Sequence, residues 1–440
     1  MLLWICLRWP EGYAPADPVT ALHRLALAML QYSPRVACLR EDAVVLEVAA
    51  SLSLFGGVRP LCRQVRQTAA SLAQAFQIGM APSASGAWLL AGAPYAVRRR
   101  VLSHQSLARN LAVLPLHSLP EARPHLQWLE NIGCRNLGGL RKLPRQGLQQ
   151  RSSPALLRAL DSAHAGAAET LSWFVPPAMF RLSYEPDTHL ERADAILAAA
   201  QPLLQALCGW LQNRQEALHD FLFVLHHEKG RRACAPTRIE LRFSVAVWKV
   251  EDINLLLKER LGHCVLKRAA IKLEIMADAP HPRAPANDSL FPDPSRYAHE
   301  ERRLLDLLAA RLGSAGIRRP RPTAHHLPEQ ANMWASTPDA PVRSSLPASV
   351  GTKARPFWLL PDPLPLSLYQ ERPIHQGRAL RLVHGPERIE TNWAASMEAG
   401  RTTAHQRRDY FVAEDAQGAR YWIYRERETG DGWFLHGLFA

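Results

Sequence analysis

Residues 179–278 constrain the fold of this chain most, because their apolar periodicity alternates between that of strands and that of helices. Strands are expected at 179–184, 220–227, 239–247 and 271–275, where apolar and polar residues alternate most clearly in the last two. Helices are expected at 190–211 and 250–261. The resulting order, β-α-β-β-α-β, is that of the split βαβ or ferredoxin-like arrangement.

The first 115 residues predict a second small unit of mixed helices and strands. A short buried strand is expected at 2–7, followed by a helix at 21–30, which Ser33-Pro34 ends. A pair of strands at 36–39 and 44–48 and a helix at 61–76 follow. The fold class expected for the whole chain is therefore α+β.

A helical hairpin is expected between residues 126 and 143, where two short apolar repeats flank the turn Ile132-Gly133. Glycine at such a turn lets the backbone approach a phosphate closely, and N–H groups at the next helix start can bind it. The pattern predicts a helix-hairpin-helix DNA contact, with an ordinary helical hairpin as the alternative. The candidate DNA-binding residues are Ile132, Gly133, Arg135, Asn136, Arg141, Lys142 and Arg145.

The charge distribution favours an anionic partner. The chain carries a net charge of +13, and no Asp or Glu occurs between Glu47 and Glu121. A solvated basic surface would also account for the charge, but so one-sided a segment is better explained by contact with a polyanion.

The segment Arg40-Glu41-Asp42-Ala43-Val44-Val45-Leu46-Glu47-Val48, followed by Leu54-Phe55-Gly56, resembles the catalytic-strand motif S-I-D-E-A-Y-L-D-V…L-F-G of Y-family (DinB-like) DNA polymerases. Asp42 falls on the Asp of that motif, but Ala43 replaces the adjacent Glu. In the first strand, Cys6 and Arg8 replace the two carboxylates of the family's I-D-M-D. Two-metal phosphoryl transfer needs several oxygen ligands converging on the cations. We therefore expect no catalytic residues, no metal site and no cofactor.

Two further departures concern nucleotide binding. After Ile78-Gly79-Met80-Ala81-Pro82 the family continues with N-K-L-L-A-K, whereas this chain has no lysine there. The interval between the first strand and Asp42 has room for one helix, where family members insert a fingers subdomain. The resemblance implies a palm remnant with reduced fingers, a helix-hairpin-helix thumb, a ferredoxin-like little finger and a C-terminal β-rich module.

The C-terminal region is expected to begin with a disordered linker and to end in an aromatic-rich β module. A hairpin is expected at 410–413 and 421–424 around Asp415-Ala416-Gln417-Gly418. In the linker, Gln330-Ala331-Asn332-Met333-Trp334 resembles the bacterial sliding-clamp motif Q-L-x-L-F. Gln330, Met333 and Trp334 are the candidate clamp-binding residues, with a chance match as the alternative. A weaker candidate is Asp288-Ser289-Leu290-Phe291.

The expected boundaries are 1–115 for the palm, 116–178 for the thumb, 179–278 for the little finger, 279–316 for a linker with an amphipathic helix, 317–356 for the disordered linker and 357–440 for the β-rich module. The seven scattered cysteines favour a reducing cytoplasm. No uninterrupted apolar stretch of membrane-spanning length is apparent, and no membrane contact is expected.

The whole pattern is similar to catalytically degenerate Y-family homologues of a bacterial mutagenesis cassette. The resemblance implies a non-catalytic, DNA-binding adaptor of SOS-type, damage-induced translesion synthesis, cytoplasmic and associated with the nucleoid. Its implied partners are DNA, the sliding clamp, an error-prone C-family polymerase and a RecA-like accessory protein. The alternatives are an active translesion polymerase that uses Asp42 and Glu47, and a clamp-independent factor that binds DNA structures.

Overall fold

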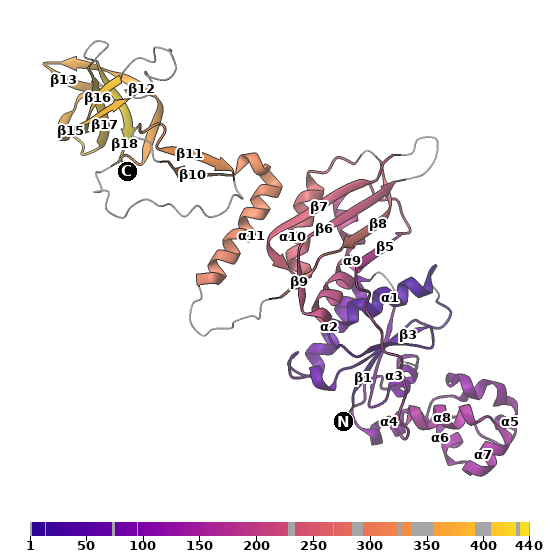
Figure 1. The fold of residues 1–440 in the computed structure, drawn as a ribbon. Helices are drawn as coiled ribbons and strands as arrows, with labels where there is room; N and C mark the ends of the chain where they lie inside the picture. The colour runs from indigo at the N-terminus through magenta and orange to yellow at the C-terminus, as the bar shows by residue number, and fades with distance from the viewer. Residues whose placement is uncertain are drawn as a thin grey trace. The chain divides into compact units, whose positions relative to one another are not determined.

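The computed structural model describes most of the chain, in two compact units, Met1–Arg311 and Leu312–Ala440 (Figure 1). The described residues are 2–13, 15–72, 75–94, 96–227, 234–266, 268–283, 294–323, 327–336, 355–391, 406–427 and 432–439.

A four-stranded antiparallel sheet in the order β2-β3-β1-β4 lies in the region where the palm is expected, and we call it the palm sheet. Its strands are β1 (Trp4–Arg8), β2 (Val36–Leu39), β3 (Ala43–Glu47) and β4 (Gln77–Ala81). Because side chains alternate along a strand, Ile5 and Leu7 belong to one hydrophobic core and Cys6 to another, on the opposite face. We call these the first and the second face of the palm sheet.

Helices α1 (Pro18–Met29) and α2 (Val58–Ser71) contribute to the core of the first face. Asp17 caps α1 by accepting a hydrogen bond from the backbone N–H of Thr20, and Pro18 occupies the first turn. As the short interval predicted, α1 is the only helix between β1 and β2 within residues 9–35, of which residue 14 is not described.

The core of the second face contains α3 (Ala84–Ala91) and a group of helices. This group comprises α4 (His104–Ala112), α5 (Leu126–Asn131), α6 (Leu137–Lys142), α7 (Arg145–Arg151) and α8 (Pro154–Ala163), with 3-10 turns at Leu116–Ser118 and Pro120–His125. The Ser83 hydroxyl donates to the carbonyl of Ala163 at 2.8 Å, and this bond ties α8 to the start of α3. The helical group is thus fastened to the palm.

A second antiparallel sheet has the predicted β-α-β-β-α-β order of elements. These are β5 (Phe180–Tyr184), α9 (Ala193–Arg214), β6 (Glu216–His227), β7 (Thr237–Val247), α10 (Val250–Gly262) and β8 (Ala270–Ala277). The sheet order is β5-β8-β6-β7, so each parallel pair joined by a helix is split by one strand. The ferredoxin arrangement has its first and third strands in the centre. Here β5 and β7, the first and third strands of the motif, lie at the edges, so the sheet order differs from that of the ferredoxin arrangement.

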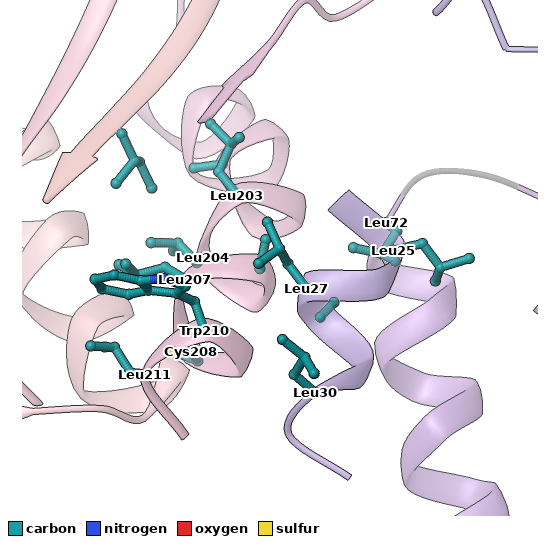
Figure 2. Packing of buried hydrophobic residues seen from close by; sticks show 14 of the residues in the cluster. Leu25, Leu27, Leu30, Leu72, Leu203, Leu204, Leu207, Cys208, Trp210 and Leu211 are labelled. Carbon is teal, nitrogen blue, oxygen red and sulfur yellow. The ribbon is translucent and has the colours of Figure 1, made fainter. Parts of the chain in front are cut away.

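Helices α1 and α9 pack closely, and one hydrophobic core joins the first face of the palm to the β5–β8 sheet. Figure 2 shows Leu27 of α1 and Leu30, which caps its C-terminal end, on the side of Leu204 and Leu207 of α9. A Cβ atom on Gly209 would lie 1.9 Å from the carbonyl oxygen of Leu27, so only glycine permits this approach. Helix α9 is also long and apolar enough to cross a membrane by length and composition alone. Of its most apolar window, 61% is buried in this core.

The segment after β8 is more ordered than the predicted linker. Strand β9 (His281–Pro282) pairs with the start of β6. Residues 284–293, which include Asp288-Ser289-Leu290-Phe291, lie outside the described part of the chain. Helix α11 (Pro294–Leu312) starts six residues before the amphipathic helix that the apolar spacing of residues 300–312 predicts.

The second unit is β-rich, and part of the predicted disordered linker belongs to it. Strands β10 (Arg318–Pro322) and β11 (Asn332–Ser336) pair antiparallel, so disorder was the wrong expectation for these residues. The described part of 323–336 also contains Leu327, which is buried in a core with Tyr410, Trp422 and Tyr424. An apolar anchor of this kind offsets the entropy of ordering a polar segment. Residues 337–354 lie outside the described part.

The main sheet of the second unit has the order β14-β13-β12-β18-β17-β16-β15. Its strands are β12 (Trp358–Tyr369), β13 (Arg372–His375), β14 (Arg378–Ala379), β15 (Arg381–Thr391), β16 (Gln406–Glu414), β17 (Arg420–Glu426) and β18 (Trp433–Leu438). The predicted hairpin is β16–β17, in which Ala413 pairs with Tyr421 and Gly418 has a φ of 86°. Two separate groups of buried side chains stabilise the module.

Candidate functional site

Asp42 lies at the centre of a cluster of side chains at the end of the palm sheet. Arg8 ends β1 opposite Ala43, the first residue of β3. Its Nε donates to Asp42 Oδ2 at 2.9 Å, and Trp88 Nε1 donates to Asp42 Oδ1 at 2.7 Å. Both carboxylate oxygens of Asp42 therefore already accept hydrogen bonds from the protein.

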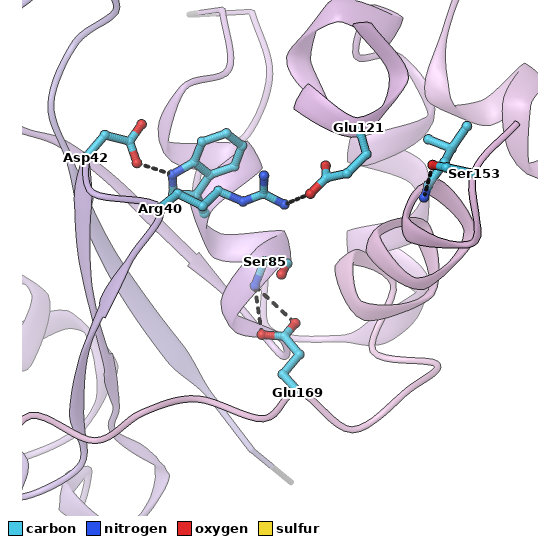
Figure 3. Close-up of polar contacts among 8 residues, drawn as sticks. Arg40, Asp42, Ser85, Glu121, Ser153 and Glu169 are labelled. Atoms are coloured by element: carbon cyan, nitrogen blue, oxygen red, sulfur yellow. Dashed lines mark hydrogen bonds and ion pairs between the residues drawn. The ribbon is translucent and has the colours of Figure 1, made fainter. Parts of the chain in front are cut away.

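The cluster also holds a second arginine and a second carboxylate. The guanidinium of Arg8 lies 3.7 Å from the centroid of the Trp88 ring, and that of Arg40 lies 4.8 Å from it. Arg40 Nη2 is 2.6 Å from Glu121 Oε1 (Figure 3). We call Arg8, Arg40, Asp42, Trp88 and Glu121 the palm cluster. Charge pairing and cation–π contact both stabilise it.

The residues present do not fit a pair of divalent cations. Arg8 brings a positive charge to Asp42, and Ala43 is fully buried without an oxygen ligand. Burial raises the pKa of the Cys6 thiol well above its usual value, and Asp42 raises it further while Arg8 lowers it. Cys6 is therefore a neutral thiol, which is a poor ligand for hard cations.

Glu47 does not complete a site with Asp42. The two residues stand at opposite ends of β3, so their Cα atoms are roughly 16 Å apart at the usual rise of a strand. Glu47 Oε1 accepts a hydrogen bond from the backbone N–H of Ala49 at 2.9 Å. Metals that act together on a phosphate lie only about 4 Å apart.

A carboxylate from another segment, that of Glu169, contacts the N-terminal end of α3, where the resembling motif has lysines. Both oxygens of Glu169 lie 3.1 Å from the backbone nitrogen of Ser85 (Figure 3). Burial raises the pKa of Glu169, against the opposing effect of this hydrogen bond. When ionised, this carboxylate would repel a nucleotide phosphate.

Trp88 is the functional residue that the sequence reasoning missed, because its apolar neighbours indicated simple packing. When Ile78-Gly79 is aligned with the family's I-G-I-A-P-N-K-L-L-A-K, Trp88 stands at the last lysine. This alignment is the feature of the sequence that singles out Trp88. The side chain is 2% exposed, yet it bonds to Asp42 and stacks on two arginines.

Six of the seven predicted DNA-binding residues lie on one hairpin, and the seventh, Arg145, begins the next helix, α7. Helices α5 and α6 flank Gly133, which has a φ of 81°, and Ile132 beside it is 46% exposed. The Asn136 side chain caps α6 by accepting from the N–H of Gly139 at 2.8 Å. The cationic side chains are all exposed, namely Arg135, Arg141, Lys142 and Arg145, of which Arg145 forms an ion pair with Asp161.

The predicted clamp-binding residues lie in the other unit. Gln330 is exposed in the turn before β11, and Trp334 on β11 is 67% exposed. Met333 pairs with Arg321 in the backbone register of the ribbon. The neighbouring Glu329 forms an ion pair with Arg408 and lies 3.7 Å from His436 Nε2. The motif is therefore displayed from a folded ribbon.

The chain is similar to known proteins over nearly its whole length. No family model matches it. Protein ImuB of Caulobacter vibrioides is 27% identical over 442 residues in strain NA1000 / CB15N and also in strain ATCC 19089 / CIP 103742 / CB 15, covering 97% of this chain and 94% of the relative.

Partial structural overlaps accompany it. A DinB family error-prone DNA polymerase from Sulfolobus solfataricus overlaps 64% of this chain and 100% of its own, at 11% identity and a TM-score of 0.33. An insertion ternary complex of Dbh DNA polymerase overlaps 59% and 76%, at 13% identity and a TM-score of 0.29. These structural overlaps are weak. The likeness of this chain to known proteins therefore rests on its sequence similarity to Protein ImuB. The chain is similar to Protein ImuB of Caulobacter vibrioides over nearly the full length of both chains.

Proposed function

We propose that this protein is a non-catalytic, DNA-binding adaptor of damage-induced, error-prone translesion synthesis. One observation carries the proposal: both carboxylate oxygens of Asp42 accept hydrogen bonds, from Arg8 and from Trp88. A Y-family polymerase would need metal ligands at this place. The protein would hold DNA through phosphates without reading bases, in the cytoplasm at the nucleoid.

The adaptor role adds three protein partners to DNA. Gln330, Met333 and Trp334 would bind the sliding clamp, with the exposed Trp334 as the hydrophobic anchor. The C-terminal module would bind the error-prone C-family polymerase and the RecA-like accessory protein. Its exposed aromatic side chains support such docking: Phe357, Trp358 and Tyr369 are each at least 60% exposed.

Primer extension tests the non-catalytic part. We expect no metal-dependent extension by the purified wild-type protein on a primed template with all four nucleotides. Extension that persists through purification and disappears with Asp42→Ala would establish the active-polymerase alternative.

Surface-plasmon binding to the cognate sliding clamp tests the tether. We expect the double variant Gln330→Ala/Trp334→Ala to lose most of its clamp affinity, and Tyr369→Ala, which removes an aromatic side chain of 63% exposure in the same unit, to keep it. A Leu290→Ala/Phe291→Ala variant examines the second motif. Loss of binding only in that variant would move the tether to residues 288–291.

The clamp-independent alternative also has an observation in its favour. Leu327 and Glu329, which directly precede the motif, are bound into the second unit by a buried contact and an ion pair. A wild-type protein that binds DNA but shows no clamp affinity would establish this alternative.

A further inference from the structure

Helix α2 exposes a row of arginines on the side that faces away from the palm sheet. Arg59, Arg63 and Arg66 are all exposed and stand at i, i+4 and i+7, a spacing that places them on one helical face. Leu61 and Val65 are fully buried on the opposite face of the helix. The helix is therefore held by its apolar side and presents three guanidinium groups to solvent.

Arg100 lies beside this row. The segment that carries it runs along β4, where Met80 N–H donates to the carbonyl of Arg99 at 2.7 Å and Val101 N–H donates to that of Met80 at 2.9 Å. Burial raises the pKa of the Cys62 thiol on α2, whereas the nearby Arg100 and Arg66 lower it. Both cations are therefore close to Cys62. We call Arg59, Arg63, Arg66 and Arg100 the α2 patch.

The α2 patch lacks counter-charges in the part of the chain that the structure describes. None of its four arginines forms an ion pair there, and no acidic residue occurs between Glu47 and Glu121 in the sequence. Arginines of the second unit behave differently: Arg388 and Arg427 pair with Asp409. The α2 patch thus keeps its positive charge available to an external anion.

We infer that the α2 patch is a second phosphate-binding surface for nucleic acid, on the side of the palm opposite the helical hairpin. Helix α2 belongs to the core of the first face through Leu61, whereas the hairpin belongs to the core of the second face through Leu137. The sheet lies between them, so the two surfaces contact different stretches of nucleic acid.

The chemistry of the α2 patch favours nucleic acid over an acidic protein. Arginine binds phosphate oxygens with two parallel hydrogen bonds. Protein interfaces usually need a buried apolar or aromatic anchor. The described residues 58–72 include no exposed large hydrophobic side chain. A polar, strongly basic surface is typical of contacts with a phosphate backbone.

Fluorescence anisotropy with a labelled random-sequence duplex tests the inference on the full-length protein over a salt series. We expect Arg63→Ala/Arg66→Ala to weaken binding several-fold. The slope of log affinity against log salt should fall by about 2, one for each lost phosphate contact. A matched variant, Arg192→Ala/Arg242→Ala, removes two exposed arginines that pair with Asp194 and Glu240. It should leave the slope unchanged.

This inference rests on the proposed function only in taking nucleic acid as the partner. The following outcomes distinguish a failure of the inference from a failure of the proposed function. Arg135→Ala/Arg141→Ala should also lower the slope, and the four-site variant should lose both contributions. Wild-type binding that responds to the hairpin variant and not to Arg63→Ala/Arg66→Ala would overturn the α2 patch alone. Absence of wild-type binding would overturn both proposals. An unchanged duplex affinity with loss of polyglutamate binding would identify an acidic protein partner and overturn the inference.

Discussion

Single residues decide what the end of the palm sheet can do. Asp42 stands where the resembling polymerase motif has its Asp, but its bonds to Arg8 and Trp88 make it the centre of a structural cluster. Its side chain is 33% exposed and that of Arg8 only 13%, so Arg8 depends more on this contact than Asp42 does. A partly desolvated cation without its carboxylate is costly.

We therefore expect Asp42→Ala to lower the stability of the protein. The free energy of unfolding should fall by about 1–3 kcal/mol, because Arg8 and Trp88 both lose a hydrogen-bond acceptor. Urea titration followed by tryptophan fluorescence measures this change. Glu130→Ala, which removes an exposed carboxylate from α5, is the control and should change it little. Equal stability of the two variants would show that the palm cluster has no structural role.

Asp409 is a second residue whose environment makes a measurable prediction. It is 1% exposed and accepts from Arg388 Nε at 2.8 Å and Arg427 Nε at 2.9 Å. The hydrogen bond from Arg388 lowers the pKa of Asp409, burial opposes this effect, and Arg427 adds to it. A carboxyl whose folded pKa is depressed stabilises the fold above its unfolded pKa, about 3.9.

Acid should therefore remove this stabilisation as the pH falls below about 4 and through the lower, folded-state pKa. We expect Asp409→Asn to be less stable than wild type at neutral pH by about 1–3 kcal/mol, and the difference to shrink in acid. Thermal melts of the second unit at several pH values measure it. A difference that stayed constant with pH would contradict the assigned ion pairs.

At the scale of helices and strands, α1 and α9 cross so closely that a side chain at the crossing point would clash. Gly209 brings the α9 backbone against the carbonyl of Leu27, and one core continues from the palm into the β5–β8 sheet. Sequence periodicity indicated both helices. It could not indicate that they touch, because they are separated by more than 160 residues.

Gly209→Ala should destabilise the first unit through overpacking. We expect a loss of about 1–3 kcal/mol, since the added methyl group would force the helices apart. Gly147→Ala in α7 is the matched control: a Cβ there meets no atom within 4 Å, and alanine favours a helix. Differential scanning calorimetry should show a lower Tm only for Gly209→Ala. An unchanged Tm would mean that α1 and α9 do not pack this closely in solution.

At the scale of the whole molecule, the chain divides into two units with separate cores. Every buried apolar residue of the first unit lies before Arg311, and the described cores of the second unit run from Leu327 to Leu435. The boundary falls within the region expected to be a linker. The second unit nevertheless starts earlier than the predicted β module, because Leu327 and Glu329 belong to it.

A fragment of residues 312–440 should fold without the rest of the chain. Removing residues 312–336 from it should lower its Tm, because the shorter fragment lacks the buried Leu327 and the Glu329–Arg408 ion pair. Circular dichroism melts of the two fragments compare them directly. Identical Tm values would show that the ribbon contributes nothing to the module.

The sequence by itself determined the succession of helices and strands in residues 2–48 and 179–278, since apolar periodicity and capping are local. It indicated the helical hairpin around Gly133, the β-α-β-β-α-β order and the β16–β17 turn at Gly418. It also predicted that carboxylates of the resembling motif are replaced, because the residue types alone show which positions lack an oxygen ligand. What a side chain meets across the fold is not local, and periodicity carries no information about it.

Only the tertiary structure decided which residues meet. It paired Asp42 with Arg8 and with Trp88, which comes from another element, and it placed Glu169 against the start of α3. It set the order of the β5–β8 sheet, which depends on strand pairing between distant segments. It ordered residues 327–336, since the buried contact of Leu327 and the ion pair of Glu329 exist only once the β module has folded.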